Sequence, residues 1–157
     1  MPEPNPKIEA LNLNDIAKRA AYQLKAKHLG IVFTSGRRDK CDQARAMAGN
    51  VIHNRKWIAQ TYVANSVSAA CQRWVDEHSD ANTSGEIAAG LLSVLNGFND
   101  AELRHLSKHL SGDAFDVQPV AANAARIKAD IRALPGLEKF LDREGGLVRW
   151  HAQFSAS

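Results

Sequence analysis

A histidine and an aspartate lie seven residues apart around a glycine in the segment Ser107–Asp116, which reads SKHLSGDAFD. This spacing is too wide for neighbouring turns of one helix. We therefore expect a loop that carries His109 and returns through Gly112 into a short strand ending at Asp116, with Phe115 pointing into the core. Histidine and aspartate together suit zinc better than calcium or magnesium. The segment predicts two ligands of a zinc site, and a polar loop before an ordinary strand is the alternative.

A catalytic zinc site needs a third protein ligand, because such sites hold three protein ligands and leave a fourth position open. His151 is the best candidate. It lies in the apolar-rich run Leu147–Phe154, which follows Gly145 and Gly146 and is typical of a strand entered through a glycine turn. A single histidine in a strand is more often structural, so this assignment depends on the Ser107–Asp116 segment.

The segment Ser107–Asp116 resembles the pattern S-x-H-x-x-G-x-A-x-D of the zinc D-Ala-D-Ala carboxypeptidases and dipeptidases. That group includes vancomycin-resistance dipeptidases, phage endolysins and the Hedgehog signalling domain. The resemblance covers roughly residues 31 to 45 and 105 to 154. It implies one Zn²⁺ held by His109, Asp116 and His151, the last following a tryptophan as in the family. It also implies a part for Ser107 in substrate binding.

Two arginines follow the predicted strand Ile31–Ser35, and a guanidinium at a strand end can bind a carboxylate or a developing oxyanion. The segment SGRRD, residues 35 to 39, is similar to the family's S-G-Y-R-S. The resemblance implies that Arg38 stabilises the transition state and that Gln43 is a substrate-binding glutamine. Arg37 stands where the family usually has an aromatic residue, so the catalytic arginine could instead be Arg37.

The expected general base is missing from its usual position. Family members commonly carry it as E-x-x-H, but Val148 stands three residues before His151. Glu144, expected at a helix end before the glycine turn, is the nearest upstream acid and our candidate. Arg149 stands where relatives sometimes have a second histidine, and we assign it to substrate binding. Either the base comes from elsewhere or catalysis has been lost. The next candidates for a base are Asp113 and His105.

The patterning predicts an α+β fold with a small, mostly antiparallel sheet and several helices, and the resemblance implies a Hedgehog or D-Ala-D-Ala-peptidase type. Residues 1–10 are expected to form a loose N-terminal lead, and residues 11–157 a single zinc peptidase domain. Helical periodicity dominates the block from about residue 45 to 100. We interpret that block as a wall of the substrate cleft or as additional packing.

The function implied by the resemblance is zinc-dependent hydrolysis of a peptide bond in peptidoglycan stem or cross-bridge peptides, of the endolysin or carboxypeptidase type. The alternative is an inactive, zinc-stabilised protein that binds cell wall or belongs to a virion. A net charge of +3 and a pI near 9.0 are compatible with an anionic cell-wall or nucleic-acid target, but the charge is too small to argue for either. A helical nucleic-acid-binding protein ranks last, because the chain has no recognisable motif for it.

We expect a monomer whose partner is a peptidoglycan peptide and which binds no nucleic acid. We expect no membrane insertion, because no apolar run approaches the length of a membrane span. The first residues lack the pattern of a signal peptide. The chain is therefore expected to be made in a bacterial host cytoplasm and to reach the cell wall by phage lysis or virion delivery.

Overall fold

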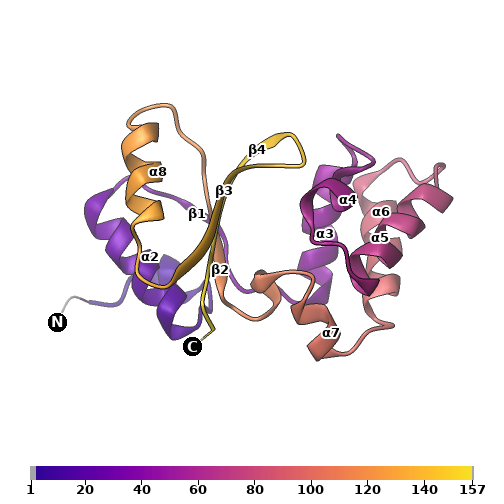
Figure 1. The fold of residues 1–157 in the computed structure, drawn as a ribbon, viewed down its shortest axis with the longest axis horizontal. Coiled ribbons are helices and arrows are strands. Elements are labelled where there is room, and N and C mark those ends of the chain that lie inside the picture. The colour runs from indigo at the N-terminus through magenta and orange to yellow at the C-terminus, as the bar shows by residue number, and fades with distance from the viewer. Residues whose placement is uncertain (1–2, 157) are drawn as a thin grey trace. The chain divides into compact units, whose positions relative to one another are not determined.

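The computed structural model describes residues 3–156 and has the predicted α+β class (Figure 1). Within these residues there are eight α-helices and one four-stranded antiparallel sheet. The internal contacts divide into two compact units where the sequence led us to expect one domain over residues 11–157. Among the described residues, unit 1 comprises 3–37, 111–143 and 148–156, and unit 2 comprises 38–110 and 144–147.

Unit 1 is built on the sheet, whose strand order is β1-β2-β4-β3. The strands are β1 (Phe33–Ser35), β2 (Ala114–Val117), β3 (Leu137–Glu144) and β4 (Leu147–Phe154). β2 pairs antiparallel with both β1 and β4. Strand β2 is therefore central, although it has only four residues.

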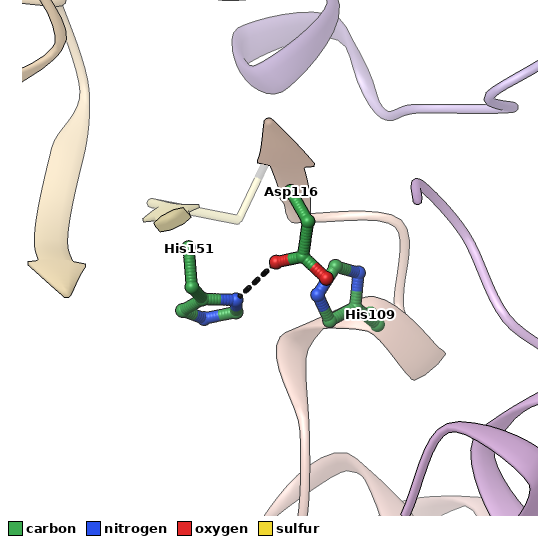
Figure 2. Close-up of side chains that lie close together, drawn as sticks. All are labelled: His109, Asp116 and His151. Atoms are coloured by element: carbon green, nitrogen blue, oxygen red, sulfur yellow. Dashed lines mark hydrogen bonds and ion pairs between the residues drawn. The ribbon is translucent and has the colours of Figure 1, made fainter. Parts of the chain in front are cut away.

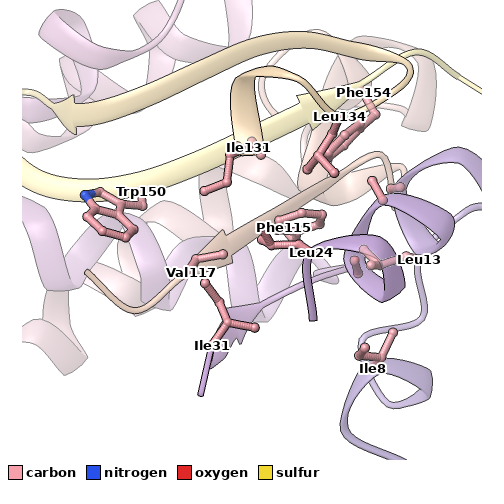
Figure 3. Packing of buried hydrophobic residues seen from close by; sticks show 14 of the residues in the cluster. Ile8, Leu13, Leu24, Ile31, Phe115, Val117, Ile131, Leu134, Trp150 and Phe154 are labelled. Atoms are coloured by element: carbon pink, nitrogen blue, oxygen red, sulfur yellow. The ribbon is translucent and has the colours of Figure 1, made fainter. Parts of the chain in front are cut away.

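Helices α2 (Asp15–Lys27) and α8 (Ala124–Arg132) lie on the same side of this sheet (Figure 1). Apolar side chains from both helices and from the sheet form one core (Figure 3). Phe115 is fully buried in it and stacks edge to face on Phe33, with ring centroids 5.1 Å apart. The prediction that Phe115 points into the core is confirmed. The sheet thus has one apolar face, and alternate residues of its strands point to the other face.

Residues 137–144 correct one expectation, because they form strand β3 where we expected a helix that ends near Glu144. Gly145 and Gly146 both have positive φ angles, of 55° and 82°, and make the turn between β3 and β4. Leu137 and Phe140 pack against the core of unit 1. Pairing with β4 and this burial outweigh the weak helical preference of the segment.

The N-terminal lead is ordered earlier than expected. Helix α1 (Pro6–Glu9) begins after Asn5, whose side chain accepts from the backbone N–H groups of Lys7 and Ile8. Ile8 is 1% exposed and belongs to the core of unit 1. The apolar anchor at Ile8 explains why order begins before Leu11.

Unit 2 is helical and contains α3 (Lys40–Val51), α4 (Trp57–Thr61), α5 (Ser66–Glu77), α6 (Ser84–Leu95) and α7 (Asp100–Arg104), followed by the 3₁₀ turn η1 (Lys108–Leu110). Its core lies between these helices and is separate from that of unit 1. The start of α3 is defined by Asp39, which accepts from the backbone N–H of Asp42 at 2.7 Å in a capping box. Among residues 3–156, none of the helices is long and apolar enough to cross a membrane.

Replacement of Phe115 by alanine should lower the free energy of unfolding by about 3 to 5 kcal/mol, because it leaves a cavity in the central strand. Urea denaturation measures this change. Leu29→Ala is the matched control, since Leu29 is 78% exposed and its loss should change stability by less than about 0.5 kcal/mol. Equal effects of the two substitutions would contradict the assignment of Phe115 to the core.

Candidate metal centre

Asp116 and His151 face each other across the pairing of β2 with β4. Their Cα atoms are direct partners in the antiparallel register, and His151 Nδ1 lies 2.9 Å from Asp116 Oδ1 (Figure 2). Their chain neighbours Phe115 and Ala152 are also partners and are buried in the core. Because side chains alternate along a strand, Asp116 and His151 point to the opposite face from that core. Strand register thus brings together two of the residues predicted as ligands.

His109 lies in the 3₁₀ turn η1 and is 2% exposed. Its backbone N–H donates to Ser107 Oγ at 3.2 Å, and its carbonyl accepts from the backbone N–H of Arg38 at 2.9 Å. Ser107, which the resemblance assigns to substrate binding, therefore holds the backbone of His109 in this structure. A role of Ser107 toward substrate stays a prediction.

The ligand atoms of His109, Asp116 and His151 all lie within 4.8 Å of one another (Figure 2). His109 and His151 are buried, and the side chain of Asp116 is 20% exposed. Two imidazoles and one carboxylate make a donor set that fits zinc with three protein ligands and one open position. The prediction that these three residues form one group able to hold a metal ion is confirmed, and the identity of the metal stays a prediction.

The loop between His109 and Asp116 turns at Gly112, which has φ of +82°. A side chain there would be strained, and its Cβ would lie 2.5 Å from the guanidinium of Arg37. Asn14 donates to the carbonyl of Ser111 and to Asp113 Oδ1, both at 2.8 Å. The positive φ of the turn thus accounts for the glycine of the motif.

Asp113, an alternative candidate for the general base, is 3% exposed and engaged within this loop. Its two carboxylate oxygens accept from Asn14 Nδ2 and from Ser111 Oγ, each at 2.8 Å. Its backbone carbonyl accepts from the N–H of Phe154 at 2.8 Å. These contacts support a structural role for Asp113. Sequence reasoning missed Asn14, because nothing in the chain pattern connects it to a loop that lies almost 100 residues away.

The two consecutive arginines have different partners. Arg37 donates to the carbonyl of Asn12 at 2.9 Å and to Asn14 Oδ1 at 2.8 Å. Arg38 donates from Nη1 to Gln43 Oε1 at 3.3 Å. The contacts of Arg37 are those of a residue that stabilises the Gly112 loop, and this supports Arg38 as the functional arginine.

Gln43 is fully buried and joins Arg38 to Tyr62, whose hydroxyl accepts from Gln43 Nε2 at 2.9 Å. Helix α3 carries Gln43 one turn after its capping box, so the same helix start orients both Gln43 and the preceding Arg38. These contacts are those of a residue that orients Arg38. Direct contact of Gln43 with a substrate stays a prediction.

The remaining candidate site residues are Glu144, Arg149 and His105. Glu144 ends β3, is partly exposed, and its carbonyl accepts from Trp57 Nε1 at 3.1 Å. Arg149 is exposed and lies two residues before His151 on β4, hence on the same face of the sheet. His105 is exposed. The roles proposed for Glu144 and Arg149 stay predictions.

Gln153 is a further neighbour of the group that sequence reasoning missed. Its Oε1 lies 3.1 Å from His151 Nε2. The available signal was strand alternation, which puts every second residue after His151 on the same face.

Comparison with family models, with curated proteins and with solved structures gives no match. The geometry of the group and the residue pattern of the chain are therefore the basis for interpreting it.

The purified protein should bind about one zinc ion per chain, because His109, Asp116 and His151 supply the three ligands of a single site. His151→Ala and Asp116→Ala should each lose the metal, measured by elemental analysis after dialysis against trace zinc. Lys108→Ala, next to His109 in the chain, is the control that should retain it. Full zinc content in the Asp116→Ala variant would contradict the ligand assignment.

Proposed function

We propose that this protein is a zinc metallopeptidase that hydrolyses a peptide bond in peptidoglycan stem or cross-bridge peptides. The observation that carries the proposal is the convergence of His109, Asp116 and His151 on one point. The resemblance of Ser107–Asp116 to the D-Ala-D-Ala-peptidase motif supports the substrate class and a Hedgehog-type fold. An endolysin or a virion-associated peptidase of a bacteriophage is the setting that this proposal favours.

The chemistry divides between the bound ion and the side chains of the chain. Zinc, when bound, would supply a Lewis acid that polarises the scissile carbonyl and lowers the pKa of a water molecule to about 7. His109, Asp116 and His151 hold the ion. The guanidinium of Arg38 stabilises the negative charge that develops on the carbonyl oxygen, and Gln43 holds Arg38 in orientation through the 3.3 Å contact.

Substrate and proton transfer are assigned to residues outside this ligand group. Arg149, exposed on the same strand face as His151, binds the peptide. Glu144 takes the proton from the attacking water and later donates it to the leaving amine.

A second candidate function is a zinc-stabilised binding or virion protein without catalysis. It is favoured by Val148, which occupies the position where relatives commonly carry the base and whose side chain is 46% exposed. This alternative keeps the metal group and removes only proton transfer, so measurements of activity distinguish it from the peptidase.

Arg38→Ala should reduce hydrolysis of purified peptidoglycan by roughly 100-fold to 1000-fold while zinc stays bound, because one donor to the developing oxyanion is lost. Release of new amino groups measures the rate. Arg37→Ala is the matched control: it should keep the rate and lose stability, since Arg37 contacts Asn12 and Asn14. The reverse pattern would move the catalytic role to Arg37.

Glu144→Gln should abolish most hydrolysis without loss of zinc, because the amide keeps the shape of the side chain and removes its basicity. The same assay of amino groups, together with zinc content, measures both properties. Glu138→Gln, an exposed substitution on the same strand β3, serves as the control. Full activity of the Glu144→Gln variant would exclude Glu144 as the base, and inactivity of the wild-type protein with zinc bound would favour the binding function.

A further inference from the structure

Both ring nitrogens of His151 have an oxygen neighbour. Nδ1 lies 2.9 Å from Asp116 Oδ1, and Nε2 lies 3.1 Å from Gln153 Oε1. Gln153 follows His151 by two residues on β4, so its side chain leaves the strand on the same face. Its cross-strand partner is Ala114, whose small side chain leaves room for the amide beside the imidazole.

A histidine that binds a metal ion through one nitrogen usually donates its other N–H group to an acceptor, which determines the tautomer and the ring orientation. The nitrogen of His151 that faces Asp116, a second ligand of the group, is Nδ1. The nitrogen that faces Gln153 is Nε2. A metal ion bound here would replace the proton on Nδ1, and the proton of the neutral ring would then be on Nε2, where it is donated to Gln153 Oε1.

We propose that Gln153 is a positioning residue, which accepts from His151 Nε2–H and holds Nδ1 toward the metal. This inference rests on one part of the proposed function, that His109, Asp116 and His151 bind a metal ion. The amide oxygen of Gln153 suits the task, because it can accept a hydrogen bond from the ring N–H. The backbone of Gln153 pairs with Ala114 whatever its side chain is, so the side chain can be replaced while the strand pairing remains.

Zinc affinity tests the proposal without any measurement of activity. Gln153→Leu should weaken zinc binding about 10-fold to 100-fold, as loss of an acceptor behind a ligating histidine does. Gln153→Glu keeps an acceptor oxygen at the same place and should bind zinc at least as tightly as wild type. Gln23→Leu, an exposed glutamine on α2, is the control for the chemical change alone. Competition with a chromophoric chelator measures all four proteins.

A second measurement reports on the ring itself. With zinc bound, ¹⁵N-edited NMR of the His151 ring should show Nε2 protonated in wild type and in Gln153→Glu, and a changed Nε2 signal in Gln153→Leu. Unchanged ring signals and unchanged zinc affinity in the Gln153→Leu variant would overturn the inference and leave the zinc peptidase intact. Absence of zinc binding in wild type would overturn both the inference and the proposed function, whereas zinc binding without hydrolysis would defeat only the proposed function.

Discussion

The antiparallel pairing of β2 with β4 is the interaction on which the candidate site depends. It aligns Asp116 with His151, two residues 35 positions apart in the chain, and at the same time buries Phe115 beside Ala152. A shift of the register by one residue would exchange the two faces, so the apolar core and the ligand pair enforce the same alignment. The energy that maintains this alignment comes from the core face, where Phe115, Trp150 and Phe154 are buried.

The loop that leads into β2 depends on a polar network of a different kind. Asn14, Arg37 and Asp113 satisfy one another's hydrogen-bonding groups around the turn at Gly112. A buried carboxylate such as Asp113 is costly without partners, and here both of its oxygens accept hydrogen bonds. Asn14, the residue that precedes α2, therefore contributes to the site although it is no candidate ligand.

The sequence predicted the parts of the structure that depend on local pattern. The α+β class and the burial of Phe115 followed from local pattern and strand alternation. The gathering of His109, Asp116 and His151 followed from ligand chemistry together with the resemblance of Ser107–Asp116 to a zinc-peptidase motif. The prediction of a helix over residues 137–144 was wrong, because pairing of β3 with β4 outweighs the local preference of the segment for a helix. The contact of Asn14 could not be predicted, since it joins distant segments. For Gln153, strand alternation indicated the face of the sheet but not the contact, which depends on the orientation of the His151 ring.

One face of β4 packs in the core, and the other face carries the residues of the candidate site. Trp150, Ala152 and Phe154 serve the core, while Arg149, His151 and Gln153 alternate with them on the other face. Substitutions among the second set leave the apolar packing untouched. The pattern of residues on that face can therefore diverge during evolution without first requiring the core to be rebuilt.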